Sequence, residues 1–382
     1  MTTKKIGVLT FYKVNNYGAE LQAFALHYKL KALGYDNELI NYPYIKNKSH
    51  RRSKRSRPIL NNSRINRLKD FILKCLDDYS KMRYPSVAAL RRSRFEAFYK
   101  QHVSLSPLYP SIDDLYNASL DYTCYIVGSD QVWNPNNQTN IAPYFLTFAP
   151  EKVKKIAYAS SFGVGTIPSG YKEKMKDLLM NIDFLSCREQ SGVAIIKELT
   201  GIKASHVVDP TMLLTKKEWI DLSIPFDFEE PYLLLFIFKP SKYVDALVKR
   251  FKAQTGLRVL RICKNEMPLE KDQDILNLRD LGPAEFLGVF NKASFVLTTS
   301  FHGSIFSILF EKPFFSITPG SKNNNARQES LLNKLGLEDR LLTEGSPIPT
   351  PEEFDLDYEA INPLVATERE KSIQFLNESL KA

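Results

Sequence analysis

Apolar residues in the first half of the chain come in short runs that alternate with longer amphipathic stretches. The runs "KIGVLTFY" at 5–12 and "NELINYP" at 37–43 predict strands, and "ELQAFALHYKLKALG" at 20–34 predicts a helix that stops at Gly34. Strands that alternate with helices are typical of a parallel α/β sheet. Further strands are expected at 122–130, 155–163, 183–189 and 202–210, and further helices at 86–102, 171–182 and 191–201.

The same alternation resumes near Pro231 and predicts a second α/β unit. The run "YLLLFIF" at 232–238 is continuously apolar, as is typical of a strand that is buried on both faces. Helices are expected at 241–256, 283–293 and 303–310, and strands at 258–263 and 294–300.

A length of 382 residues exceeds the usual size of one hydrophobic core, so two domains are expected. We predict an N-terminal α/β domain at 1–222, a linker rich in proline and acidic residues at 222–231, and a C-terminal α/β domain at 231–345. A tail with a helix follows at 346–382. The predicted fold class is α/β, with two Rossmann-like doubly wound domains that face each other across a cleft.

Composition excludes several classes of protein. Hydrophobic residues make up 43% of the chain, yet no apolar run approaches the roughly 20 residues that span a bilayer. The start "MTTKKIGVLTFY" is interpreted as a first strand rather than as a signal peptide. The four cysteines, Cys75, Cys124, Cys187 and Cys263, form no CxxC pair, so neither a zinc site nor a disulfide framework is predicted. These features favour a cytoplasmic protein.

Much of the formal charge of +9 comes from one segment, 46–74, which is crowded with Lys and Arg and carries Asp70 as its one acidic residue. Three interpretations are open. The segment is a solvated basic loop, it is attracted to anionic lipid headgroups, or it binds nucleic acid. Nucleic acid is not expected as a partner, because none of the usual reader motifs accompanies the charge.

One histidine lies inside the most apolar segment of the chain, 294–317. We expect His302 in the turn between a strand and a helix that begins at Gly303, where ligands collect in parallel sheets. Helix N-termini there carry unpaired N–H groups and about half a positive charge, which favours phosphate or carboxylate. Ser300 and Ser304 supply hydroxyl groups to this candidate site. The alternative is that His302 only caps or packs against the helix.

Three further stretches place polar residues at the ends of predicted strands. Arg188, in "SCREQSG", presents a guanidinium suited to carboxylate or phosphate, and its alternative role is a surface pairing with Glu189 and other charges. In "YIVGSDQVWNP", Asp130 is a candidate base or a simple cap, and Ser129 stands beside it. The first strand-to-helix turn offers a polar loop without the GxGxxG or Walker pattern, so a dinucleotide site is not predicted. Its residues are Asn15, Asn16, Tyr17 and Gly18.

Five motifs occur in a fixed order: "NNYGAELQAFAL", "IVGSDQVWNP", "SCREQSG", "VVDPTMLL" and "SFHGSIFS". In this combination the chain resembles the polysaccharide pyruvyl transferase family, from the first strand to about Arg340. The resemblance implies a two-domain fold similar to that of GT-B glycosyltransferases. It also implies transfer of pyruvate from phosphoenolpyruvate onto two hydroxyls of a sugar, which leaves a ketal and free phosphate. His302 and Arg188 match the positions that the family associates with the phosphoenolpyruvate site.

The resemblance further implies an acceptor side in the N-terminal domain and a donor side in the C-terminal domain. The expected partners are phosphoenolpyruvate, as donor substrate rather than cofactor, and a lipid-linked saccharide at the inner face of a bacterial membrane, which the 46–74 segment would approach. Arg327 is expected to add a cation from a flexible loop, or to be a solvated loop charge. No metal is expected. The alternatives are a GT-B-type glycosyltransferase that uses a nucleotide sugar, and a non-catalytic ligand-binding homologue.

Overall fold

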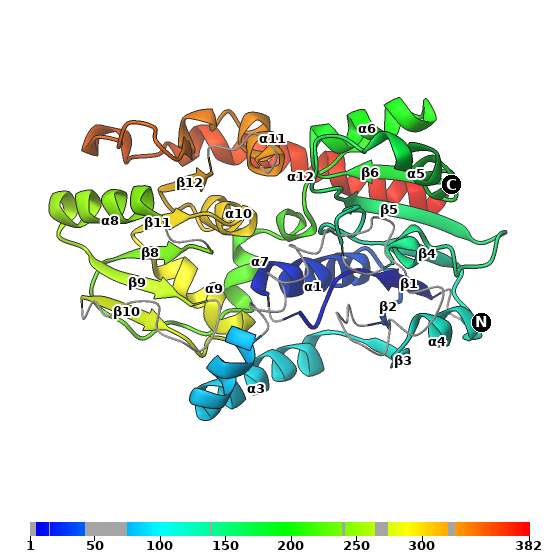
Figure 1. Cartoon of the computed structure of the whole chain (residues 1–382), viewed down its shortest axis with the longest axis horizontal. Helices are drawn as coiled ribbons and strands as arrows, with labels where there is room; N and C mark the ends of the chain where they lie inside the picture. Colours follow the sequence, from blue (N-terminus) through cyan, green and yellow to red (C-terminus); the bar gives the residue numbers. More distant parts are fainter. Residues whose placement is uncertain are drawn as a thin grey trace. The chain divides into compact units, whose positions relative to one another are not determined.

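The structure is a computed structural model of the whole chain, and it describes residues 5–382 apart from 15, 43–74, 138–139, 239–240, 264–273 and 320–324. The chain divides into two compact units. The first takes in the described residues up to 42, together with 99–214 and 366–382. The second takes in 75–98 and 215–365. Each unit has its own sheet of parallel strands (Figure 1).

The first unit has a sheet in the order β3-β2-β1-β4-β5-β6-β7, in which every described pair of neighbours is parallel. This is the doubly wound Rossmann order, and its direction reverses between β1 and β4. The strands are β1 (Ile6–Leu9), β2 (Asn37–Asn41), β3 (Leu105–Leu108), β4 (Cys124–Val127), β5 (Lys154–Ser160), β6 (Phe184–Cys187) and β7 (Ser205–His206). The helices include α1 (Tyr17–Ala32), α4 (Ile112–Asn117), α5 (Lys172–Leu179), α6 (Gln190–Thr200) and the 3₁₀ turn η5 (Pro210–Leu213).

Strands β1 and β4 are buried along their whole length, which explains their unbroken apolar sequences "IGVL" and "CYIV". Next to them, the indole of Trp133 stacks on Phe145 with ring centroids 5.1 Å apart, and its N–H donates to the carbonyl of Tyr144. This aromatic core fixes the backbone that follows β4, because burying each of these rings removes a large apolar area from water.

The second unit repeats the same topology with the sheet order β10-β9-β8-β11-β12-β13. Its direction reverses between β8 and β11, so it is a second Rossmann-like sheet. The strands are β8 (Tyr232–Phe236), β9 (Arg258–Ile262), β10 (Ile275–Leu278), β11 (Phe295–Thr298), β12 (Phe314–Thr318) and β13 (Leu341–Thr343). The helices include α7 (Lys216–Asp221), α8 (Lys242–Thr255), α9 (Pro283–Lys292), α10 (Phe301–Leu309) and α11 (Ala326–Lys334).

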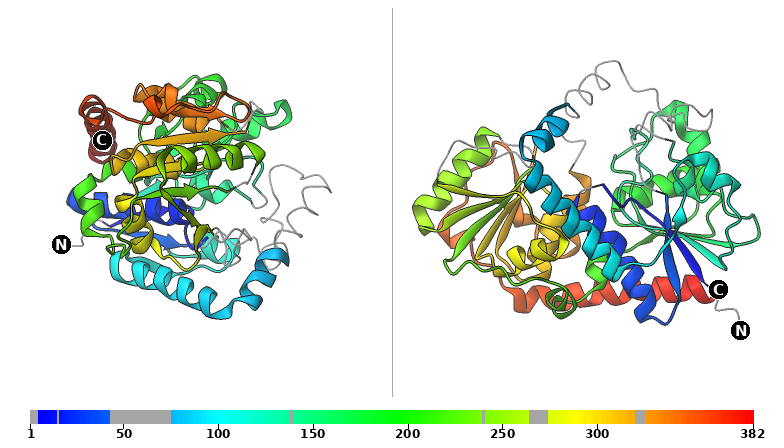
Figure 2. Two further views of the ribbon diagram at one scale, coloured as in Figure 1. Left: turned by 90° about the vertical axis from the view of Figure 1, so that its left-hand side faces the viewer. Right: turned by 90° about the horizontal axis from the view of Figure 1, so that it is seen from below.

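Helices cover both faces of this second sheet (Figure 2). Leu233 and Leu235 of β8 pack in one cluster with Phe251 of α8. Phe236, which points the opposite way, meets Phe286 of α9 at 5.3 Å between ring centroids. Successive side chains of a strand alternate between its two faces, so burial on both sides requires the continuous apolar run that predicted this strand.

The chain crosses between the two units more often than the domain limits expected from the sequence. Helix α3 (Pro85–His102) begins in the second unit and ends in the first, and α12 (Tyr358–Lys381) does the same. The second half of α12 is tied to the first sheet, since Ser372 accepts a hydrogen bond from the backbone N–H of Val208 at 2.9 Å. The expected tail at 346–382 is therefore divided between the units. In the described part of the chain, no helix has the length and apolar character needed to cross a bilayer.

Candidate functional site

Asp130 follows β4 at the point where the first sheet reverses direction. Its backbone is left-handed, with φ of 72°, a conformation that aspartate tolerates better than most residues. The carbonyl of Asp130 accepts hydrogen bonds from the N–H groups of Val132 at 2.8 Å and Ser161 at 3.0 Å. These bonds tie the turn to the end of β5 and hold the side chain of Asp130 at the carboxyl edge of the sheet.

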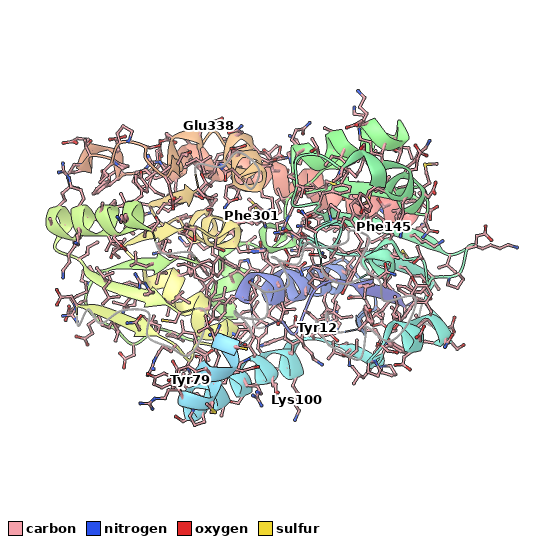
Figure 3. All side chains as sticks on the ribbon, in the orientation of Figure 1. Tyr12, Tyr79, Lys100, Phe145, Phe301 and Glu338 are labelled. Carbon is pink, nitrogen blue, oxygen red and sulfur yellow. The ribbon has the colours of Figure 1, made fainter. Side chains whose placement is uncertain are left out.

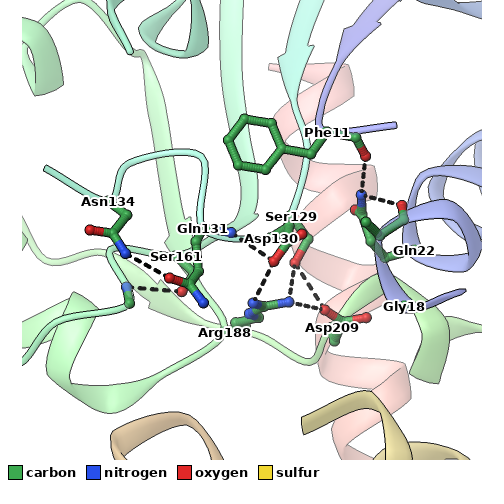
Figure 4. A network of polar contacts seen from close by, with 12 residues as sticks. Phe11, Gly18, Gln22, Ser129, Asp130, Gln131, Asn134, Ser161, Arg188 and Asp209 are labelled. Carbon is green, nitrogen blue, oxygen red and sulfur yellow. Dashed lines mark hydrogen bonds and ion pairs between the residues drawn. The ribbon is translucent and has the colours of Figure 1, made fainter. Parts of the chain in front are cut away.

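Arg188 follows β6 at the same edge and joins two carboxylates (Figure 4). Its Nη1 lies 2.6 Å from Oδ2 of Asp209, and its Nη2 lies 3.2 Å from Oδ1 of Asp130. Nη1 also donates to the hydroxyl of Ser129 at 3.3 Å. We call Ser129, Asp130, Arg188 and Asp209 the edge network. Its residues follow the carboxyl ends of three strands, β4, β6 and β7.

Burial makes this network strongly electrostatic. The side chains of Arg188 and Asp209 are 1% and 0% exposed, whereas that of Asp130 is 18% exposed. Burial alone would lower the pKa of Arg188, but the carboxylates of Asp209, Asp130 and Glu189 together raise it above its ordinary value. The interpretation of Arg188 as part of a surface pairing is wrong, because its guanidinium lies inside the unit among carboxylates.

Both carboxylate oxygens of Asp209 accept hydrogen bonds. Its Oδ1 accepts from the N–H of Thr211 at 3.0 Å and from the Thr211 hydroxyl at 2.7 Å, which caps η5. Its Oδ2 accepts from Ser129 at 3.0 Å as well as from Arg188. Asp130 is therefore the carboxylate of the edge network that is best placed to meet a ligand, because it alone retains clear exposure to solvent.

The first strand-to-helix turn lies against the same edge. Asn16 caps α1, since its side-chain oxygen accepts from the N–H of Gly18 at 3.0 Å, and Tyr17 is buried in the first turn. Helix α1 packs on η5, and the hydroxyl of Thr10, after β1, donates to the carbonyl of Ser129 at 2.8 Å. Asn16, Tyr17 and Gly18 are thus brought to the region of the edge network. Asn15 lies outside the described residues.

His302 belongs to the second unit, at the corresponding edge of its sheet. Ser300 caps α10 by accepting from the N–H of Gly303 at 3.2 Å, so α10 begins at Phe301 and His302 lies in its first turn rather than in the preceding loop. His302 is buried, with 7% of the residue exposed. Ser304 points inward and donates to the hydroxyl of Ser316 at 3.0 Å. Ser300 and Ser304 therefore shape the helix start.

Gly303 and Arg327 determine the packing and the charge at the N-terminus of α10. A Cβ atom at Gly303 would lie 2.2 Å from Oγ1 of Thr298, so the close packing of α10 on β11 requires glycine. The guanidinium of Arg327 lies 5.8 Å from the ring centroid of Phe301. The expectation of a flexible loop at Arg327 is wrong, because this residue is in the first turn of α11. Its charge therefore lies next to the N-terminus of α10.

Comparison with protein families identifies the chain. A model of polysaccharide pyruvyl transferases matches residues 16–321. The chain belongs to the polysaccharide pyruvyl transferase family. The match includes strands of both sheets, all except β1 and β13, and all five motifs apart from Asn15 of the first. It confirms the resemblance seen in the sequence. A comparison with curated proteins finds no match.

Solved structures show the fold of this family member. UDP-GlcNAc 2-epimerase from Neisseria meningitidis bound to UDP-GlcNAc aligns with a TM-score of 0.51 at 9% identity, over 98% of this chain and 100% of that one. The epimerase from Methanocaldococcus jannaschii aligns with a TM-score of 0.45 at 10% identity, over 95% and 92%. An alpha-glucosyltransferase in complex with UDP and DNA aligns with 0.49 at 10% identity, over 97% and 94%. The alignment with the Neisseria enzyme and the two parallel sheet orders confirm the prediction of two Rossmann-like doubly wound domains.

The edge network of this pyruvyl transferase family member contains a residue that sequence reasoning did not name. Asp209 stands in the motif "VVDPTMLL", and Asp followed by Pro and Thr at the end of a strand is a signal for a capping carboxylate. No local sequence pattern predicts the ion pair between Asp209 and Arg188, which lie 21 residues apart in the chain. Within the described ranges, no group of three or more His, Cys, Asp or Glu side chains is arranged to hold a metal ion.

Proposed function

We propose that this chain transfers pyruvate from phosphoenolpyruvate onto two hydroxyls of a sugar in a polysaccharide precursor, forming a ketal and releasing phosphate. The observation that carries the proposal is the family match over 16–321, whose motifs contain the edge network and the N-terminus of α10. Both are at carboxyl edges of doubly wound sheets, which is where such folds bind ligands.

The reaction needs an acid, a base and a place for anions. Protonation of the methylene carbon of phosphoenolpyruvate makes its neighbouring carbon oxocarbenium-like, and a sugar hydroxyl adds to it while losing its proton. The bond to phosphate then breaks, phosphate leaves with one proton, and the second hydroxyl loses its proton as it closes the ketal. The two hydroxyl protons therefore balance the one on carbon and the one on phosphate.

We assign the donor to the second unit. The N–H groups and partial positive charge at the start of α10 suit its anionic groups, and Arg327 adds a cation beside them. His302, in the first turn of this helix, is proposed as the acid or as the partner of the phosphate. A general acid of this kind contributes about 10²–10⁴-fold to the rate.

We assign the acceptor to the first unit, where Asp130 is the proposed base for its hydroxyl. Family resemblance gives Arg188 the anionic groups of the donor, but its guanidinium is already engaged by Asp209 and Asp130. We therefore propose that Arg188 is a positioning residue that fixes the carboxylate of Asp130. An incoming anion would have to compete with a buried carboxylate 2.6 Å away.

The proposed acceptor is a lipid-linked saccharide, and the basic segment 46–74, which lies outside the described residues, is proposed to favour an anionic membrane surface. Phosphoenolpyruvate is a substrate in this scheme, and no cofactor is required. The chain would then act in the cytoplasm as a peripheral enzyme at the inner face of a bacterial membrane.

The test is phosphate release from phosphoenolpyruvate with a panel of lipid-linked sugars. We expect turnover with at least one acceptor, and a loss of about 10²–10⁴-fold in kcat for His302→Ala and for Asp130→Asn. Matched controls are His102→Ala and Asp177→Asn, which change the same residue types away from either edge and should keep kcat within about twofold.

A thermal-shift experiment separates the alternatives. Stabilisation by phosphoenolpyruvate, and none by UDP-sugars, supports the proposal, because a ligand that binds only the folded state raises its stability. Stabilisation by a UDP-sugar alone, with transfer of the sugar, would make the chain a glycosyltransferase. Binding of phosphoenolpyruvate without phosphate release from any acceptor would leave only a ligand-binding role.

A further inference from the structure

A carboxamide is buried without a hydrogen-bond partner at the start of α11. Gln328 is 6% exposed, and its Oε1 has no partner among the residues that the structure describes. Buried polar side chains nearly always have a partner in folded proteins, because the loss of hydrogen bonds to water otherwise costs free energy. The other buried residues of this helix are Leu331 and Leu332. An apolar side chain at 328 would suit this packing better, so the presence of glutamine needs another explanation.

The position of Gln328 points to a ligand. It is the third residue of α11 (Ala326–Lys334) and belongs to the first turn. Side chains of an α-helix lean towards its N-terminus, so this carboxamide lies over the end where backbone N–H groups have no partner within the helix. Asn325, the residue before the helix, does not cap it and donates instead to the carbonyl of Pro319 at 3.3 Å. The unpartnered carboxamide is therefore combined with the partial positive charge of a helix start.

The start of α11 is a neighbour of the start of α10. Strands β11 and β12 pair in parallel, and one of the two helices follows each of them. The guanidinium of Arg327 lies 5.8 Å from the ring centroid of Phe301, the first residue of α10, which is labelled in Figure 3. The ring of Phe301 lies in turn 5.3 Å from the imidazole of His302, between centroids. Because the cation of α11 reaches the first residue of α10, the two helix starts share one positive region.

Two adjacent helix starts suit a ligand with two anionic groups. Phosphoenolpyruvate has a phosphate and a carboxylate, and both are favoured by backbone N–H groups and by a guanidinium. His302 is the proposed acid or phosphate partner at α10, which leaves α11 for the carboxylate. The carboxamide of Gln328 can turn about its last bond, so that its NH₂ group donates to a carboxylate oxygen. Glu329, the acidic residue of this turn, is exposed to water.

We propose that the start of α11 binds the carboxylate of phosphoenolpyruvate, with the carboxamide of Gln328 and the guanidinium of Arg327 as donors, while the start of α10 holds the phosphate. Gln328 then determines specificity, because it distinguishes this donor from phosphate esters that lack a carboxylate. A ligand oxygen as partner also explains why the chain supplies none. The inference rests on the proposed function, since it concerns the donor that this function requires.

The experiment is calorimetric titration of the full chain with two probes. The first is phosphoenolpyruvate, and the second is vinyl phosphate, which carries hydrogen where phosphoenolpyruvate carries its carboxylate. We expect the parent to bind phosphoenolpyruvate at least about tenfold more tightly, because hydrogen bonds to a charged group are strong. Neither titration contains an acceptor, so binding is measured separately from phosphate release.

Variants of Gln328 test its contact with the carboxylate. Gln328→Met removes the carboxamide at similar volume, and we expect the Kd of phosphoenolpyruvate to rise about tenfold while that of vinyl phosphate stays within about twofold. Gln328→Glu introduces a like charge and should raise the Kd of phosphoenolpyruvate further. The matched control is Gln254→Met, in the last turn of α8, whose Oε1 likewise has no partner in the described part of the chain. It should bind both probes like the parent.

The stability of the protein without ligand provides a second measurement. Replacing a buried polar group that has no partner by an apolar one removes a desolvation cost. Gln328→Met should therefore unfold at the same urea concentration as the parent or at a higher one. A lower midpoint would mean that the carboxamide stabilises the folded chain itself, and it would overturn the proposal.

The outcomes separate this inference from the proposed function. The expected pattern in Gln328→Met, with Gln254→Met like the parent, supports the inference even if no acceptor leads to phosphate release. An unchanged Kd for phosphoenolpyruvate in Gln328→Met overturns it, and phosphate release by the parent would then leave the proposed function in place. Equal losses for both probes also overturn it, because Gln328 would then contact the phosphate. A parent that does not bind phosphoenolpyruvate overturns both.

Discussion

Arg188 and Asp209 form a buried ion pair, with Nη1 of the arginine 2.6 Å from Oδ2 of the aspartate. The pair joins the end of β6 to the turn after β7, and each partner holds additional hydrogen bonds to Ser129. Removing one charge from such a pair leaves the other without compensation in a low-dielectric interior, which is far more costly than removing both.

We therefore predict strong coupling between these two positions. Arg188→Met should lower the free energy of unfolding by about 3–5 kcal/mol, and Asp209→Leu should have a comparable effect. The double variant should be less destabilised than the sum of the two, and urea unfolding of all four proteins measures the difference. Strict additivity would show that the ion pair contributes nothing. Lys217→Met with Asp221→Leu, an exposed pair on α7, is the control and should be nearly additive.

A conservative replacement separates positioning from donor binding. Lysine keeps the charge of Arg188 but cannot reach two carboxylates with a planar fork, so Arg188→Lys should leave Asp130 poorly fixed. If the proposed function holds, we expect kcat to fall by roughly tenfold or more while KM for phosphoenolpyruvate changes little.

The opposite change in kcat and KM of Arg188→Lys would indicate a different role for Arg188. A large rise in KM for phosphoenolpyruvate with kcat unchanged would mean that the guanidinium contacts the donor itself. Lys154→Arg is a suitable control, because its ammonium group donates to a backbone carbonyl at the far end of α12 and not to the edge network.

Sequence periodicity predicted most of what positions the candidate site. Apolar runs such as 232–238 located the buried strands, because a parallel strand must be apolar on both faces. The pattern missed β13, whose three residues "LLT" are too short to show a period, and it missed α11 because Gln328 and other polar residues obscure its apolar side.

The motifs also predicted polar side chains at particular strand ends, but not which of these side chains pair with one another. Asp130 and Arg188 were named from their residue types at strand ends, 58 residues apart. That Arg188 is buried depends on Asp209 reaching it from a third strand end, and this long-range contact has no local sequence signal.

Gly303 offers a test of the packing at the start of α10. A methyl group there would lie 2.2 Å from Oγ1 and 2.9 Å from Cβ of Thr298, so the helix terminus must shift. We predict that Gly303→Ala lowers the free energy of unfolding by about 1–3 kcal/mol, despite the better helix propensity of alanine. Gly165→Ala, where nothing lies within 4 Å of the added atom, should change stability little. Urea unfolding of both variants decides the point, and equal effects would contradict it.

His27 makes the stability of the first unit depend on pH. The ring is fully buried, with Nδ1 2.7 Å from Oδ1 of Asn37 and Nε2 accepting from the backbone N–H of Ser104 at 3.3 Å. A proton on Nε2 would face that N–H donor. Burial lowers the pKa of His27 from 6.5 to about 4, and the hydrogen bond to Asn37 offsets part of this effect.

The sign of the pH effect follows from this lowered pKa. The unfolded chain binds a proton at His27 below about pH 6.5, whereas the folded chain binds one only near pH 4. The contribution of the neutral imidazole to the free energy of unfolding is therefore complete above pH 6.5 and decreases as the pH falls towards 4. The loss should be on the order of 3 kcal/mol. Urea unfolding at intervals across this range measures it, and His27→Gln should remove most of the slope. The half-buried His102, changed to Gln, should leave most of the slope in place. A parent protein whose stability stays constant between pH 6.5 and 4 would contradict the neutral, buried imidazole.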